Sequence, residues 1–114
     1  MIDQWVSFSR RGPVDVIHLT GEIDMSNAAD IGRAIAVSAA ESGAVLIDLT
    51  TVSFLDSAGV RLLDAVVGDL IQAGVPIRLV VGERSAARMT LQLCAFREDL
   101  LADDLDRAAT ELSR

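Results

Sequence analysis

Short runs of aliphatic and β-branched residues alternate along the chain with segments in which apolar residues recur every three or four positions. The first two runs, Trp5–Arg10 and Val14–Leu19, flank the tripeptide Arg11-Gly12-Pro13. Two β-rich runs separated by a Gly-Pro turn predict a hairpin, and we expect its second strand to end at Gly21.

The segment 26–42 predicts the first helix, with Ser26 or Asn27 as its N-cap and Gly43 as its C-terminal stop. Its apolar stripe consists of Ile31, Ala34, Ile35 and Ala39. The run 44–49 that follows is almost continuously apolar, which is typical of a strand covered by its neighbours. We expect this strand to break at Thr50-Thr51 and to be followed by a loop over residues 52–56.

The most strongly patterned helix follows that loop and is expected to stop at Gly74 and Pro76. Its apolar residues are Leu62, Leu63, Val66, Val67, Leu70 and Ile71. Beyond it, Ile77–Val81 predicts a strand, Arg84–Phe96 a helix and 103–112 a last helix, with a short strand near Leu100.

This order of elements predicts a single α/β domain over residues 1–114. Alternation of strands and helices favours a mostly parallel sheet of four to five strands, and the opening hairpin adds an antiparallel edge. Where consecutive strands lie side by side, right-handed crossovers place the helices mainly on one face of the sheet. We therefore expect a one-sided α/β sandwich.

Composition and charge exclude several classes of function. Seventeen carboxylates face ten basic residues, a net charge of −7, and no basic face for a nucleic acid is visible. The chain has no lysine, one histidine (His18) and one cysteine (Cys94), so a Walker loop, a Schiff-base lysine and a structural zinc site all lack their residues. We expect no cofactor and no metal.

The first residues contain no apolar stretch like that of a signal peptide, and no run is long enough for a membrane span. The sequence therefore predicts a cytoplasmic protein that does not associate with a membrane. A chain of 114 residues can bury its own core, so a monomer is expected, with a weak homodimer as the alternative.

Candidate chemistry is concentrated where the loop 52–56 meets the strongest helix, at Asp56-Ser57-Ala58-Gly59. Either Asp56 or Ser57 is expected to cap the helix, because both side chains accept bonds from first-turn amides. A phosphate on Ser57 would be tolerated there, because a helix N-terminus favours negative charge. The same four residues could also serve only as a cap and a close-packed first turn.

Three segments together resemble the STAS family, and in particular its stand-alone bacterial members, the anti-sigma factor antagonists. These segments are Gly21-Glu22-Ile23-Asp24, Leu46-Ile47-Asp48-Leu49-Thr50 and Phe54-Leu55-Asp56-Ser57-Ala58-Gly59. The resemblance covers almost the whole chain. It implies a non-enzymatic switch that binds an anti-sigma factor, itself a serine kinase, and thereby frees a sigma factor.

The resemblance also assigns roles to residues. The kinase phosphorylates the serine that matches Ser57, which releases the antagonist, and a serine phosphatase restores it. Asp56 matches the acid beside that serine, and Asp24 matches an acid near the same loop. Ala58 and Gly59 complete the segment that supports the phosphorylation site and the partner-binding surface.

Other functions fit the residues less well. A serine hydrolase needs a Gly-x-Ser-x-Gly turn, but Leu55 stands where the first glycine belongs, and mid-strand His18 is expected to be a hydrogen-bonded structural residue. A response-regulator receiver would use Asp48 but needs a lysine. An accessory or scaffold subunit of a transporter or stressosome-type complex remains the alternative for a STAS chain. Cys94 is expected to be a small buried hydrophobe.

Overall fold

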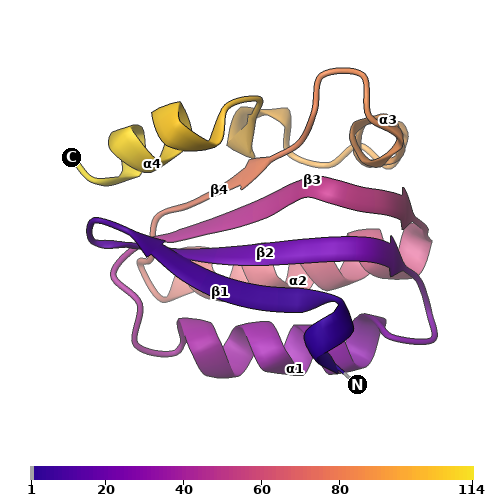
Figure 1. Ribbon diagram of the computed structural model, residues 1–114, viewed down its shortest axis with the longest axis horizontal. Coiled ribbons are helices and arrows are strands. Elements are labelled where there is room, and N and C mark those ends of the chain that lie inside the picture. Colours follow the sequence, from indigo (N-terminus) through magenta and orange to yellow (C-terminus); the bar gives the residue numbers. More distant parts are fainter. Residues whose placement is uncertain (1) are drawn as a thin grey trace.

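Five strands form one sheet in the order in which they follow one another along the chain (Figure 1). The computed structural model describes residues 2–114. Its strands are β1 (Val6–Arg11), β2 (Val14–Ile23), β3 (Val45–Leu55), β4 (Ile77–Val80) and β5 (Leu101–Ala102). β1 pairs antiparallel with β2 and all other pairs are parallel, which confirms the predicted hairpin edge and mostly parallel sheet.

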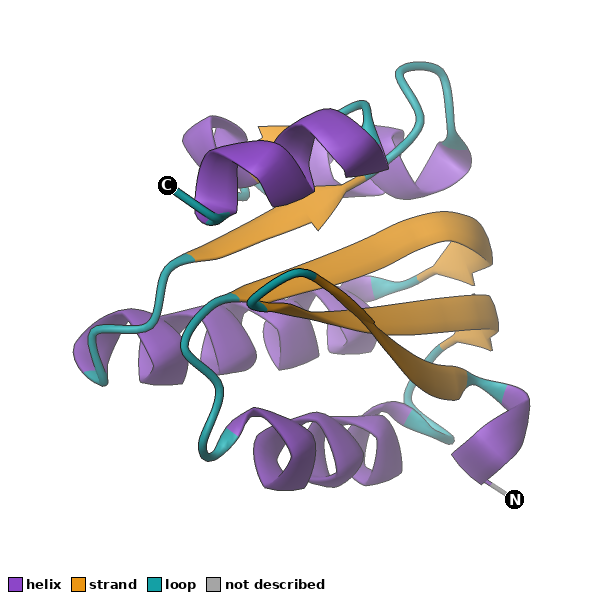
Figure 2. Ribbon diagram, turned by 60° about the vertical axis from the view of Figure 1, so that its left-hand side comes forward, coloured by secondary structure: helices purple, strands orange, loops and turns teal. Residues whose placement is uncertain are grey.

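The helices lie on both faces of the sheet, with the two longest on the same one (Figures 1 and 2). They are α1 (Ala28–Ala39), α2 (Ser57–Gln72), α3 (Ala86–Leu93) and α4 (Leu105–Leu112), with 3-10 turns at Ile2–Gln4 and Glu98–Leu100. α1 and α2 cover one face, as predicted for right-handed crossovers between neighbouring parallel strands. α4 packs on the opposite face, so the sandwich is not one-sided throughout, and α3 lies beside the C-terminal half of β3, beyond the end of short β4 (Figure 1).

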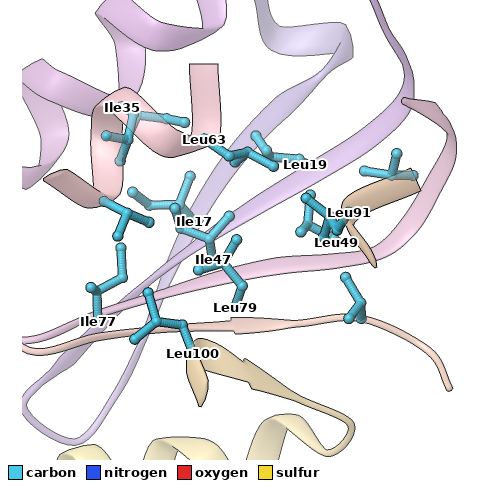
Figure 3. Close-up of a cluster of buried hydrophobic side chains, with 14 of the residues drawn as sticks. Ile17, Leu19, Ile35, Ile47, Leu49, Leu63, Ile77, Leu79, Leu91 and Leu100 are labelled. Carbon is cyan, nitrogen blue, oxygen red and sulfur yellow. The ribbon is translucent and has the colours of Figure 1, made fainter. Parts of the chain in front are cut away.

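The main core lies between the sheet and the helices α1 and α2. Strand residues that point to this face alternate with residues that point away, as the period of a strand requires. Fully buried side chains from three neighbouring strands meet those of both helices (Figure 3): Ile17, Leu19, Ile35, Ile47, Leu63 and Leu79.

A smaller core holds α4 on the other face. Ala108 and Ala109 of α4 contact the alternate residues of the central strands, and these small side chains allow the helix to approach closely. The strand residues in this second core are Val14, Val16, Leu46 and Val80. Near β1, this face carries polar and partly exposed side chains instead.

A hydrogen-bonded chain across β1, β2 and β3 fills that polar part of the face. His18 Nδ1 lies 2.8 Å from Asp48 Oδ2, and His18 Nε2 lies 2.8 Å from the hydroxyl of Ser9. With Nδ1 protonated, His18 donates to Asp48 and accepts from Ser9, so one tautomer satisfies all three groups. His18 is thus a hydrogen-bonded strand residue, as predicted, and lies away from Ser57 on a different element.

Asp48 is buried and is held at both oxygens. Its Oδ1 accepts from the backbone N–H of Thr50 at 2.9 Å and from the Thr50 hydroxyl at 2.7 Å. Burial alone would raise the pKa of Asp48, but these bonds and the one from His18 together hold that pKa below its ordinary value. The carboxylate therefore stays ionised inside the sheet at neutral pH.

The predicted break at Thr50-Thr51 was wrong, because β3 continues to Leu55. His18 pairs with Asp48 but Thr20 pairs with Thr51, so β3 contains one extra residue there, and a second irregularity follows between Gly21 and Glu22. Bulges of this kind interrupt the alternation of apolar and polar residues from which a strand is recognised. β2 likewise runs past Gly21, which has a positive φ of 81°, to Ile23.

The predicted burial of Cys94 was also wrong, because its side chain is exposed. α3 ends at Leu93, and Ala95 adopts a positive φ of 57° immediately afterwards. This turn directs Phe96 rather than Cys94 into the main core. The apolar residues keep a helical spacing as far as Phe96, although the helix itself ends at Leu93.

Asp48→Asn is predicted to lower the free energy of unfolding at pH 7 by about 1–3 kcal/mol, because an amide NH2 cannot accept from His18 or Thr50 as the carboxylate does. The lowered pKa means that this stabilisation is complete above the unfolded-state pKa of about 3.9 and is lost as the pH falls through the folded-state pKa. Urea unfolding from pH 7 to pH 3 should show the gap between wild type and variant narrowing below about pH 4.

The exposed Asp64→Asn provides the control and should leave the stability nearly unchanged at every pH. A gap between wild type and Asp48→Asn that stayed constant down to pH 3 would contradict the role assigned to the Asp48 charge.

Candidate functional site

Asp56 joins the end of β3 to the start of α2. Its backbone is extended and its Oδ1 accepts from the N–H of Gly59 at 3.0 Å, while its carbonyl accepts from the N–H of Val60 at 3.0 Å. Asp56, rather than Ser57, is therefore the N-cap of α2. Ser57 is the first residue of α2, and its side chain is exposed.

The loop after β2 packs against this junction. Asp56 Oδ2 accepts from the N–H of Met25 at 3.3 Å, and the Asp56 N–H donates to the carbonyl of Ile23 at 3.3 Å. β2 and β3 are adjacent and parallel, so their carboxyl ends meet at the same edge of the sheet. The structure therefore brings the segment that contains Asp24 beside the segment that contains Ser57.

Asp24 is a permanent negative charge in this region. Its Oδ1 accepts from the Ser26 hydroxyl and from the Ser26 N–H, the latter at 2.9 Å. The bond from the Ser26 hydroxyl, with that from the Ser26 N–H, holds the pKa of Asp24 below its ordinary value. Asp24 thus adds a negative charge to the loop that packs against Asp56, the residue before Ser57.

Asn27 also contributes to this site, a role that the sequence did not predict. It occupies the N-cap position of α1, yet its side chain makes no capping bond to that helix. Its Oδ1 accepts from the Asp24 N–H at 3.0 Å, and its Nδ2 donates to the Glu22 carbonyl at 2.9 Å. The side chain is buried and fixes the loop that carries Asp24, a role that its position after an acidic segment does not reveal.

Gly59 lies in the first turn of α2, close to the end of β2. A Cβ atom at this position would lie 3.2 Å from Ile23 Cγ2 and 3.3 Å from the Ile23 carbonyl oxygen, and would also collide with Leu55. Ala58 beside it is half-buried. The absence of a side chain at Gly59 therefore lets the first turn of α2 lie close to Ile23 and Leu55.

Comparison with known families identifies the fold. The family model of the STAS domain matches residues 7–108, which is most of the chain. The chain belongs to the STAS domain family. Comparison with curated protein sequences gives no significant match.

Solved structures with this STAS fold include regulators of sigma factors. An anti-sigma factor antagonist from Mycobacterium paratuberculosis is 30% identical, with a TM-score of 0.83 over 96% of this chain and 93% of that chain. The Bacillus cell fate determinant SpoIIAA in its phosphorylated form is 21% identical, with a TM-score of 0.70 over 96% of this chain and 99% of that one. RsbS of Moorella thermoacetica is 16% identical, with a TM-score of 0.80 over 95% and 94%.

None of the helices within residues 2–114 has the length and hydrophobicity that a membrane crossing requires. Over the same residues, no cluster of three or more histidine, cysteine or acidic side chains has an arrangement suited to a metal ion.

Gly59→Ala is predicted to destabilise this STAS domain by about 1–3 kcal/mol, because the added methyl group must displace Ile23 or Leu55 in a packed region. Gly68→Ala in the same helix is the matched control, since a Cβ there meets no atom within 4 Å. It should stabilise by about 0.5–1 kcal/mol through helix propensity. Chemical denaturation of both variants checks this, and equal effects would contradict the close approach at Gly59.

Proposed function

We propose that this STAS domain is an anti-sigma factor antagonist that is switched by phosphorylation of Ser57. The proposal rests on the start of α2, where Asp56 and Ser57 have separate roles. Asp56 makes the cap, so the Ser57 hydroxyl is exposed and is not needed to hold the helix. The identity of 30% to an anti-sigma factor antagonist over nearly the whole chain supports the same role.

The electrostatics of the site support the switch. Transfer of the γ-phosphoryl group of ATP to Ser57 Oγ, with release of ADP and a proton, adds about −1.5 to −2 charges at neutral pH. This charge arises next to Asp56, against which the loop that contains Asp24 packs, on a chain whose net charge is already −7. A partner surface fitted to the neutral hydroxyl then loses affinity through repulsion and through desolvation of the phosphate.

The fold is expected to survive the modification. A helix N-terminus stabilises negative charge, and solvent reaches the exposed Ser57. SpoIIAA has been solved in phosphorylated and unphosphorylated forms, and these match this chain with TM-scores of 0.70 and 0.76. Phosphorylation in that protein is thus compatible with the fold, and the switch acts on the partner rather than on folding.

The proposal defines a set of partners. The unmodified chain binds an anti-sigma factor with serine kinase activity and so releases a sigma factor, and a serine phosphatase reverses the modification. The chain is a substrate and a switch rather than an enzyme, and it acts in the cytoplasm without direct contact with nucleic acid. Asp24, Asp56, Ala58 and Gly59 support the docking surface around Ser57. The chain acts as a monomer or as a weak homodimer.

The first test is the intact mass of the purified chain after incubation with ATP and an extract of its own organism. Wild type should gain one phosphate, and Ser57→Ala, treated in the same way, should gain none. If wild type gains no phosphate while the kinase in the extract is shown to be active, the proposal fails. A role as an accessory or scaffold subunit of a transporter or stressosome-type complex would then be favoured.

The second test concerns the effect of charge at position 57 on binding. Calorimetry with the anti-sigma factor should show Ser57→Ala binding as tightly as wild type and Ser57→Glu binding at least about tenfold more weakly, a loss of about 1.4 kcal/mol. Ser7→Glu adds the same charge at an exposed position on β1, away from the site, and should bind like wild type. Equal affinities for Ser57→Ala and Ser57→Glu would remove Ser57 from the switch.

A further inference from the structure

Arg61 is an unpaired cation on the helix that begins at Ser57. Seven arginines form salt bridges within residues 2–114, and the three that do not are Arg61, Arg84 and Arg114. Of these three, only Arg61 lies within a helix or strand. An exposed guanidinium without a carboxylate partner is available to a group that the unmodified chain does not contain.

Helix geometry directs this side chain toward Ser57. Arg61 follows Ser57 by four residues in α2, so the two side chains are neighbours on one face of the helix, with Cβ atoms about 5–6 Å apart. Side chains of a helix lean toward its N-terminus, and a long side chain therefore covers the turn before its own Cα. For Arg61, that turn is the one that starts at Ser57.

Backbone donors of the first turn are partly occupied already. The Gly59 N–H is bound to the Asp56 carboxylate, and the Val60 N–H is bound to the Asp56 carbonyl. A phosphate on Ser57 cannot use these two amides without breaking the cap. The guanidinium of Arg61 offers a fork of N–H donors that matches the geometry of a phosphate.

Arg61 also lines a groove between α1 and α2, with a volume of about 620 Å³. Ala58 and Leu62 of α2 and Gly32 and Ala36 of α1 line the same groove, so its walls are largely apolar. Arg33 lines it too, but is paired with Asp30 of its own helix. In the unmodified chain, Arg61 is thus the free cation among the residues of this groove.

We propose that Arg61 is the residue that binds the phosphate on Ser57. This inference rests on the proposed function, in which Ser57 is the site of phosphorylation. Modification then changes the docking face in two ways, because it adds an anion at Ser57 and withdraws a cation from the groove between α1 and α2. A partner that docks on the unmodified face loses both the neutral hydroxyl and the free guanidinium.

The test uses the full chain with phosphoserine installed at position 57 by genetic encoding, so that no kinase is needed. A pH titration followed by phosphorus NMR gives the second pKa of the phosphate. Pairing with Arg61 should make this pKa lower in the otherwise wild-type chain than in Arg61→Gln, by about 0.3–1 pH unit. Arg61→Lys, which keeps the charge but not the fork of donors, should give an intermediate value.

Arg33→Gln is the matched control, since Arg33 lines the same groove from α1, and it should leave the phosphate pKa unchanged. Thermal unfolding of the unphosphorylated variants verifies that each one folds. Equal phosphate pKa values in the wild-type and Arg61→Gln chains would overturn the proposal. A lower pKa in wild type, together with no phosphorylation of the natural chain in the organism's extract, would uphold the Arg61 contact and refute the proposed function.

Discussion

The parallel pairing of β2 with β3 is the constraint on which the functional end of the molecule depends. The two strands are paired from Asp15 and Val45 to Ile23 and Leu55, so they end at the same edge of the sheet. Each strand leads directly into a helix on the same face, which places the segments that contain Asp24 and Ser57 next to each other. Asp56 then ties these segments together, because it caps α2 and accepts from the backbone of the loop after β2.

The junction between β3 and α2 has a packed inner side and a polar, exposed outer side. On the inner side, Gly59 lets the first turn of α2 contact Ile23 and Leu55, which fixes the helix against the core. On the outer side, Ser57 is exposed to solvent and the loop that contains Asp24 packs against the neighbouring Asp56. Because the Ser57 side chain is exposed, a change of charge there does not require the close packing around Gly59 to change.

The opposite face of the sheet has an apolar part and a polar part. α4 covers the side near β4 with small alanine contacts, and the side near β1 carries the chain of hydrogen bonds through Ser9, His18 and Asp48. An ionised Asp48 in a central strand is stable because its two oxygens receive bonds from His18 and Thr50. This network explains how the only histidine and a buried acid are accommodated in two neighbouring strands of the sheet.

Much of this architecture is determined by local features of the sequence. Period-two and period-3.6 spacing of apolar residues predicts the strands and the helices, and the Asp56-Ser57-Ala58-Gly59 segment indicates a capped helix start after a buried strand. Spacing could not predict the length of β3, because its bulges break the alternation after Asp48. Nor could it predict that Cys94 is exposed, because a single residue with positive φ, Ala95, redirects the chain.

Only the tertiary structure decided which residues meet. The bond from the Met25 N–H to Asp56 and the bond between His18 and Asp48 join residues on different elements or loops, 30 or more positions apart in the sequence. The unpaired state of Arg61 likewise depends on where every carboxylate of residues 2–114 lies. Sequence patterns report which face of its own element a side chain occupies, whereas pairing between elements depends on how strands align and helices pack, and this is a property of the whole fold.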